Sequence, residues 1–451
     1  MELPMPALAA RLAIVLMLGL ALAAPAWAGA TSAVVHKAAV QVHGAPDFKA
    51  PTVATLARGA SVTVAGQQGM WFRIALPAGQ SGYVRVNDVR MAPAGTEGAA
   101  ADVRALFTGK AGKGRVTETA GVRGLDESTL QAAGYDGAQM ALLQSYRAGT
   151  DAAADYARDH GWTATSVAFP AEARPGARGG STQARKRGGI SAARGLLSQI
   201  GGGAFGGHAN EALEVADAAA GKSEEELSAE ELALGPEIAG RILGAAPLLE
   251  DADAQRRVNL IGRWLASQTT RPELPWSFGV IDSAEVNAFA APGGYVLVTR
   301  GLYELLADDA EVAAVLGHEI GHVVQRDHYN VIRKQAVTET GGNIVAGHVD
   351  VGGSLAANMA KDYVRRHGAT VMLTRLDREA EFRADEAAEI YLARAGGNPL
   401  ALYAVLQKMA ALGTQSASLA QLYKTHPGLD DRLDRCDRRG LAGLQRYTRR
   451  D

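Results

Sequence analysis

Five consecutive residues, His318-Glu319-Ile320-Gly321-His322, follow the pattern H-E-x-x-H within a segment that has helical character. Residues four apart on a helix lie one turn apart on nearly the same face, so the two imidazoles can bind one zinc ion without distorting the backbone. Glu319 follows the first histidine by about 100° and can reach a water beside the metal. The pattern predicts metal-assisted hydrolysis, with zinc as Lewis acid and Glu319 as general base.

The neighbouring residues predict the helix that must carry these side chains. Asp308 or Asp309 can cap its N-terminus, and Glu311 adds negative charge to the first turn. Glycine costs a helix about 1 kcal/mol relative to alanine, so we expect Gly321 to leave room for a metal or a crossing element. The alternative is a helix with two solvated histidines. Apolar residues at helical spacing predict a buried face made of Val312, Leu316, Ile320 and Val323.

A catalytic zinc ion needs a third protein ligand and an open position for water. Residues 377–395 are rich in Ala, Glu and Arg and contain no Gly or Pro, which predicts a second helix. Glu381 could bind zinc from this helix. Asp385, one turn later, could accept the free ring N–H of a zinc-binding histidine, which we expect to be His318. The alternative is an exposed charged helix with ion pairs between successive turns.

Four separated segments resemble the zinc metallopeptidase family (M48-type, gluzincin-like) that includes the CAAX prenyl endopeptidase, HtpX and BepA. They are residues 286–302, which contain N-A-F-A-A-P-G-G, residues 309–323 with the H-E-x-x-H pattern, residues 378–385, and residues 425–432. The third segment matches the family pattern R-x-x-E-x-x-A-D, and the fourth matches T-H-P-x-x-x-x-R. The resemblance covers roughly residues 236–440.

This resemblance implies a zincin-type domain that binds one Zn²⁺ ion per chain. By position, His318, His322 and Glu381 are implied as the zinc ligands. The chain departs from the family at Asp377, where a serine is frequent, and this leaves the capping of the second helix open.

A small hairpin is predicted just before the metal helix, because apolar runs at 278–282 and 286–290 and a β-rich run at 295–299 surround a Pro-Gly-Gly turn. The resemblance implies an edge strand beside the cleft. Such a strand could bind unfolded or loop segments of protein substrates by β-augmentation. An ordinary core hairpin is the alternative. The expected edge strand contains Asn287, Ala288, Phe289 and Ala290.

Several further side chains have open roles. Pro427 favours an extended backbone at His426, which could bind the oxyanion, occupy the open zinc position as an inactivating latch, or lie in a surface loop. Arg378 and Arg432 could stabilise developing negative charge or serve the structure alone. His328 is predicted to face solvent at the end of the metal helix.

The N-terminus and the composition predict the compartment. Residues 1–28 are typical of a secretory signal, with an apolar run at 12–24 and an A-x-A cleavage site at 26–28, so we expect an exported protein, periplasmic or secreted. The mature chain contains no second long apolar run, although contact with a membrane surface stays open. Cys436 is the single cysteine, which excludes an internal disulfide. A formal net charge of −2 gives no general attraction to nucleic acid.

The chain is predicted to be multidomain. The expected order is a signal peptide (1–28), a small all-β SH3-like barrel (29–95), a helical segment (96–165), a Gly/Ala/Arg-rich linker with helices (166–235) and a mainly α zincin-type metallopeptidase domain with a small β-hairpin or sheet at the cleft (236–445).

The likeness of residues 66–71 to SH3-like modules implies binding of wall glycan or envelope proteins, with Trp71 and Tyr83 in a core or a groove. The sequence thus predicts a zinc endopeptidase acting on exported proteins in envelope quality control. The alternative is a latched or inactive metallopeptidase that serves as a chaperone or scaffold and is localised by the SH3-like module.

Overall fold

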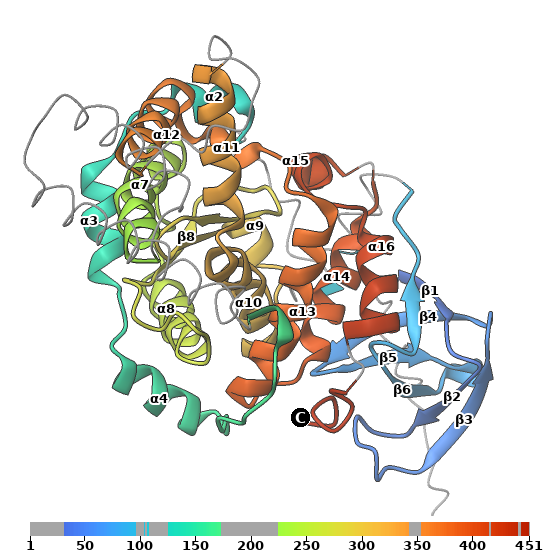
Figure 1. Cartoon of the computed structure of the whole chain (residues 1–451). Coiled ribbons are helices and arrows are strands. Elements are labelled where there is room, and N and C mark those ends of the chain that lie inside the picture. Colours follow the sequence, from blue (N-terminus) through green and yellow to red (C-terminus); the bar gives the residue numbers. More distant parts are fainter. Residues whose placement is uncertain are drawn as a thin grey trace, which may run out of the picture.

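The computed structural model describes residues 31–95, 103, 106–107, 125–172, 224–341, 353–414, 416–440 and 443–450. The expected signal peptide and most of the expected linker lie outside these residues. Within the described ranges, every helix is too short or too polar to cross a bilayer. Figure 1 shows an N-terminal sheet lying against a larger, mainly helical body.

The N-terminal region is one antiparallel sheet with the strand order β3-β2-β6-β5-β4-β1-β7. Its strands alternate buried and exposed residues, as the period of two requires when one face covers a core. The two end strands, β3 and β7, do not pair with each other, so the sheet is open. The β-rich region is confirmed, whereas the SH3-like barrel is not. The strands are β1 (Thr31–Val35), β2 (Ala39–His43), β3 (Thr52–Ala57), β4 (Ser61–Gln68), β5 (Trp71–Ala75), β6 (Ser81–Arg85) and β7 (Val89–Met91).

Trp71 is covered rather than open to a ligand. Its side chain is only 2% exposed. The rings of His43 and Phe48 meet it edge-on at centroid distances of 5.3 and 4.9 Å. The guanidinium of Arg85 lies 4.9 Å from its ring centroid. Of the two readings left open for this tryptophan, the structure therefore favours the core.

The helical body is built around a second, three-stranded sheet with the order β8-β10-β9. Strand β8 (Ser277–Ile281) runs parallel to β10 (Tyr295–Thr299), and β9 (Ala288–Ala291) runs antiparallel to β10. The predicted hairpin is therefore β9–β10, and β9 is an edge strand. Both faces are buried because helices cover each of them, which explains why these strands are almost continuously apolar.

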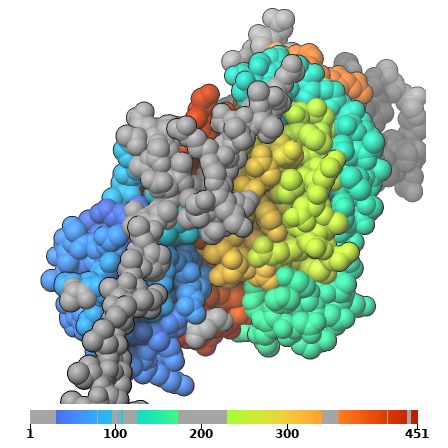
Figure 2. Space-filling view, turned by 180° about the vertical axis from the view of Figure 1, so that it is seen from behind, coloured from blue at the N-terminus to red at the C-terminus, as the bar shows by residue number. Residues whose placement is uncertain are grey.

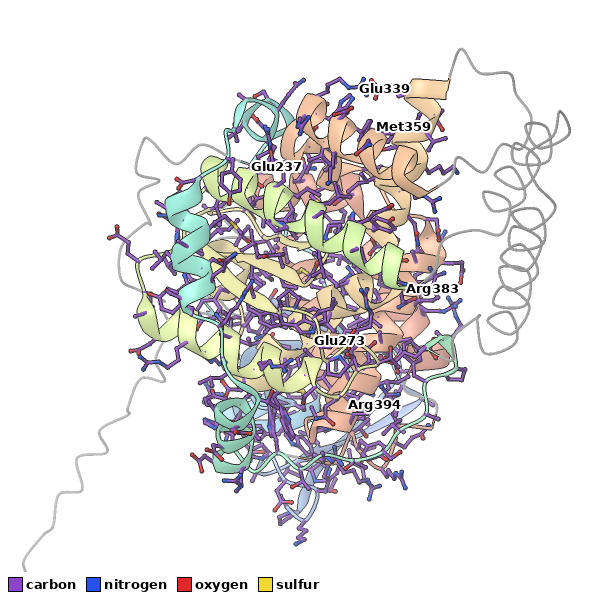
Figure 3. All side chains as sticks on the ribbon, turned by 60° about the vertical axis from the view of Figure 1, so that its left-hand side comes forward. Glu237, Glu273, Glu339, Met359, Arg383 and Arg394 are labelled. Carbon is purple, nitrogen blue, oxygen red and sulfur yellow. The ribbon has the colours of Figure 1, made fainter. Side chains whose placement is uncertain are left out.

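Alternate residues of β10 face two separate cores. Val296 and Val298 belong to a core shared with α8 and α10, while Tyr295 and Leu297 belong to a core shared with α7. Figure 3 shows α7, with Glu237 labelled on it, crossing in front of the other elements. The helices of this half are α2 (Glu127–Ala132), α3 (Gly137–Ser145), α4 (Thr150–Asp159), α7 (Glu224–Ala245), α8 (Ala252–Ala266), α9 (Arg300–Tyr303) and α10 (Asp309–Gln325).

The remaining helices complete the body on the other side of α10. Figure 3 shows Glu339 of α11 and Met359 of α12 at the same end of the molecule. Helices α13, α14 and α16 lie between α10 and the N-terminal sheet (Figure 1). These elements are α11 (Asp327–Gly341), α12 (Gly353–His367), the 3₁₀ segment η3 (Gly368–Leu373), α13 (Arg378–Ala395), α14 (Leu400–Leu412), α15 (Ala420–Thr425) and α16 (Leu429–Arg435).

The N-terminal sheet is joined to the body by buried polar contacts. The Gln407 side chain on α14 accepts a hydrogen bond from Met91 N (2.9 Å) and donates to Val86 O (2.9 Å). Gln67 on β4 donates to Glu311 Oε1 at 2.7 Å, which links the sheet to the first turn of α10. Figure 2 shows, on the rear face, the blue N-terminal sheet on one side and green residues of the helical body on the other. The sheet is therefore packed directly onto the body.

Candidate metal centre

Helix α10 carries the H-E-x-x-H residues through the middle of the body. Asp308 caps it, with a side chain that accepts a hydrogen bond from Glu311 N at 3.0 Å. Every residue from Glu311 to Val323 is buried. The buried part of the helix is thus wider than the predicted apolar face, because the sheet, α13 and α14 surround the helix on all sides.

The crossing element expected at Gly321 is α13. A Cβ atom at Gly321 would lie 3.0 Å from Ala387 Cβ and 3.3 Å from Ala384 Cα, and one at Gly317 would lie 3.2 Å from Ala388 Cα. The glycines of α10 and the alanines that face them on α13 therefore let the two helices come close. The start of α13 is capped by Asp377, which accepts a hydrogen bond from Ala380 N at 2.7 Å. Asp377 thus fills the capping position that the sequence left open.

The close crossing brings His318, His322 and Glu381 together. The two Nε2 atoms lie 3.2 Å apart. Glu381 Oε2 is 3.7 Å from His318 Nε2, and its Oε1 is 3.8 Å from His322 Nε2. Ligand atoms at 2.0–2.1 Å from a tetrahedral zinc would lie about 3.3 Å apart, so these separations need only small adjustments. Glu381 Oε2 is buried without a hydrogen-bond partner among the described residues, as expected of an atom that binds a cation.

Two carboxylates orient the histidine rings. His318 Nδ1 lies 2.9 Å from Asp385 Oδ1, and His322 Nδ1 lies 2.9 Å from Asp327 Oδ2. Each Nδ1–H therefore donates to an acid, and each Nε2 lone pair is left for the metal position. Sequence reasoning expected Asp385 but missed Asp327. The available signal was an acid just after the metal helix, where Arg326 takes a left-handed conformation (φ 59°) and α11 begins.

Burial and charge set the protonation states of the site. Burial, with the nearby charge of Arg432, lowers the pKa of His318 to about 4, so this imidazole is neutral at neutral pH. Burial raises the pKa of Glu381 to about 7 and also raises the pKa of Glu319. A raised pKa suits a carboxylate that has to take up a proton near neutral pH.

The two arginines left open by the sequence have different environments. Arg432 is 3% exposed and donates to both Asp385 oxygens, at 2.9 and 2.6 Å. Burial would raise the pKa of Asp385, but Arg432 and His318 hold it well below its usual range. Arg378 is not brought to the site, because its side chain is exposed and pairs with Asp431 at 2.8 Å. Arg432 therefore contacts Asp385 inside the centre, and Arg378 lies outside it.

His426 lies beside the metal ligands rather than in an exposed loop. Its Nε2 is 3.7 Å from Glu381 Oε2, and its Nδ1 lies 2.8 Å from Thr425 Oγ1. Ligand atoms of His318, Glu381 and His426 all lie within 4.8 Å of one another. Burial lowers the pKa of His426 well below its ordinary value, which leaves a neutral imidazole with a free lone pair that could bind a metal.

A narrow pocket opens onto the metal ligands and is bounded by the edge strand β9. Asn287, Ala288 and Phe289 line it, whereas the expected Ala290 points into the α8/α10 core. The empty volume, including the open mouth, is about 350 Å³. Segment η3 and the residues after it form the opposite wall. The lining residues are Asn287, Ala288, Phe289, Glu319, His322, His328, Met372, Thr374, Leu376, Glu381, Thr425 and His426.

The prediction that His328 faces solvent was wrong. Its ring meets that of His322 at a centroid distance of 5.7 Å and lines the pocket. Burial lowers the pKa of His328 to about 3. The helix that was expected to end in solvent is followed at once by α11, which turns this side chain inward. The periodicity of α10 alone carried no signal for that turn.

Comparison with known proteins agrees with this geometry. Residues 252–439 match the model of Peptidase family M48. The chain is 27% identical over 223 residues to the beta-barrel assembly-enhancing protease of Escherichia coli, which covers 48% of this chain and 45% of that protein. It is 32% identical over 193 residues to the protease HtpX of Pseudomonas entomophila, a match that covers 36% of this chain and 65% of that protein. It is 27% identical over 174 residues to the metalloprotease LoiP of E. coli, a match that covers 38% of this chain and 66% of that protein. The chain thus spans about half the length of the first relatives it matches.

Proposed function

We propose that this chain, whose residues 252–439 are a domain of Peptidase family M48, is a zinc-dependent endopeptidase that acts on exported proteins. One observation carries the proposal. The Nε2 atoms of His318 and His322 and the carboxylate of Glu381 face a common point, and Glu381 Oε2 has no other described partner. Zinc bound there would polarise a water and the peptide carbonyl.

Glu319 is the proposed general base. It lines the same pocket as Glu381 and His322, and burial raises its pKa. It would take a proton from the attacking water and pass it to the departing amine. Asp385 and Asp327 orient the two imidazoles, with Nδ1–H turned away from the metal position.

The pocket suits an extended segment of an unfolded or loop-containing protein. Strand β9 is an edge strand, and Asn287, Ala288 and Phe289 line the pocket beside it. Backbone hydrogen bonds from an added peptide strand would supply affinity, and the side-chain pocket would supply selectivity. Asn287 Oδ1 is buried without a described partner, which supports this role.

We assign the activity to the cell envelope as part of the same proposal. Residues 1–28 are typical of an export signal, and one relative is named a beta-barrel assembly-enhancing protease. The N-terminal sheet would bind cell wall or envelope proteins in the manner of an SH3-like module. Retention of the full chain on purified cell-wall sacculi, compared with a variant Phe48→Ser, which changes a partly exposed ring in the loop between β2 and β3, tests the localising role.

The deciding experiment combines metal analysis with digestion of unfolded casein. We expect about one zinc per chain in the wild type and in Glu319→Gln, with cleavage reduced about 10²- to 10⁴-fold in the variant. Glu379→Gln, on the exposed side of α13, is the matched control and should cleave normally. Undiminished cleavage by Glu319→Gln would refute the mechanism.

A second candidate function rests on His426. Because its ligand atom lies within 4.8 Å of those of His318 and Glu381, it can fill the open metal position and latch the enzyme in an inactive state. The protein would then act as a chaperone or scaffold until the latch opens. His426→Ala separates the two, since it increases casein cleavage if the histidine is a latch and decreases it if the histidine binds the oxyanion.

A further inference from the structure

One histidine of the pocket, His328, has no task in the proposed mechanism. His328 Nδ1 is buried and has no hydrogen-bond partner among the described residues. A buried polar atom without a partner is uncommon in a folded protein and calls for a ligand or a water. The metal explains the similar state of Glu381 Oε2, and an added peptide strand explains that of Asn287 Oδ1. Neither the metal nor an added peptide strand explains the unpartnered Nδ1 atom of His328.

His328 lies beside His322, on one side of the proposed metal position. The rings of His318 and His322 are 4.7 Å apart between centroids. His426 meets the His318 ring at 6.1 Å, while His328 meets the His322 ring at 5.7 Å. The two extra histidines thus contact different members of the metal-binding pair. A peptide crossing the centre would meet His426 and His328 through residues on different sides of the cleaved bond.

The surroundings of His328 restrict what it can recognise. Phe289, Met372 and Leu376 make much of the wall apolar, and Glu319 and Glu381 place two carboxyl groups in the same pocket. An acidic side chain would meet those carboxyl groups, and a purely apolar one would leave Nδ1 unpaired. A short uncharged side chain with a hydrogen-bonding group can pack against the apolar wall and also form a hydrogen bond with the imidazole.

We propose that His328 is a specificity-determining residue that binds an uncharged hydrogen-bonding side chain (Ser, Thr, Asn or Gln) of the substrate, at a residue flanking the cleaved bond. This inference rests on the proposed peptidase function. His328 touches the substrate and neither binds the metal nor takes part in proton transfer. Its removal therefore changes which peptides are cleaved and leaves the zinc content unchanged.

The test uses the full zinc-loaded chain and matched peptides. Cleavage sites are first mapped in unfolded casein, and fluorogenic peptides are then made with Thr or its isostere Val at each flanking position. We expect the wild type to prefer Thr at one position by about tenfold or more in kcat/KM. In His328→Leu, kcat/KM should fall for the Thr peptide and stay unchanged for the Val peptide, so that the preference is lost. His328→Asn, which keeps a hydrogen-bonding atom near the Nδ1 position, should retain part of it.

The controls separate this inference from the proposed function. His160→Leu removes a histidine outside the pocket and should keep the Thr preference. An equal loss on both peptides in His328→Leu, or no Thr preference in the wild type, would overturn the inference while leaving the peptidase intact. If the zinc-loaded wild type cleaves nothing, the proposed function fails, and calorimetric binding of an unstructured casein peptide, made with Thr or Val at one position, to wild type and His328→Leu decides the role of His328.

Discussion

Nδ1 of His318 lies 2.9 Å from Oδ1 of Asp385, a contact that joins the metal helix α10 to α13 inside the core. Asp385 is itself held by the buried guanidinium of Arg432 on α16. The orientation of one proposed metal ligand, His318, thus depends on a side chain from a third helix. Residues that never touch the metal should therefore control how well it binds.

Replacing Asp385 by asparagine should weaken zinc binding by roughly 10- to 100-fold, because the His318 tautomer and ring orientation lose their anchor. Competition with a chromogenic chelator measures the affinity. Asp362→Asn, on the exposed side of α12, provides the control and should bind zinc like the wild type. Unchanged affinity in Asp385→Asn would show that the contact does not orient the ligand.

The buried pair of Lys408 and Glu311 should be essential for stability. Lys408 Nζ lies 2.6 Å from Glu311 Oε2, and both side chains are fully buried. Lys408→Met should reduce the free energy of unfolding by about 3–5 kcal/mol, since it leaves an unpaired buried carboxylate. Urea denaturation measures the loss, and the double variant Lys408→Met/Glu311→Leu should recover much of it. Lys361→Met, at an exposed position, should have little effect; a comparable loss there would argue against a specific role for the pair.

The crossing of α10 and α13 should not tolerate a methyl group at Gly321. On an exposed helix Gly→Ala would stabilise by about 1 kcal/mol. Here the added Cβ would meet Ala387 Cβ at 3.0 Å and the α13 backbone at 3.3 Å, so we expect a net loss of about 1–3 kcal/mol and weaker zinc binding. Thermal melts with and without zinc report both effects. Gly134→Ala, where nothing lies within 4 Å, is the control. A stabilised Gly321→Ala variant would contradict this packing.

Glu389 should make stability depend on pH. It is fully buried beside the thiol of Cys436, and burial raises its pKa well above the usual range. The folded state therefore holds this proton more tightly than the unfolded state, whose pKa is about 4.3, and stability should fall as pH rises above that value. Glu389→Gln should flatten the fall, seen as a higher melting temperature than wild type at pH 8 but not at pH 5. Glu386→Gln, which is exposed, should leave the slope unchanged, and an unchanged slope in Glu389→Gln would refute the assignment.

Burial also raises the pKa of the nearby Cys436 thiol, which keeps it protonated. A protonated, buried thiol is a poor nucleophile and a poor metal ligand. This environment makes the Cys436 thiol unreactive.

The sequence by itself determined the features that depend on local spacing. The i, i+4 relation of His318 and His322, and that of Glu381 and Asp385, follows from helical geometry alone, and the β9–β10 hairpin follows from its turn and its apolar runs. The cap of the first helix, predicted at Asp308 or Asp309, is local in the same way, whereas the cap at Asp377 was left open. Each depends on residues within a few positions of one another.

Only the tertiary structure decided which distant groups meet. It separated Arg432, which is buried against Asp385, from Arg378, which is exposed, although both are arginines near acidic residues. It turned Asp327 and His328 toward His322, and it joined the N-terminal sheet to α10 through Gln67. The physical reason is that these contacts depend on how closely α10 and α13 cross and on how the chain turns after α10, and hydrophobic periodicity fixes neither distance nor direction.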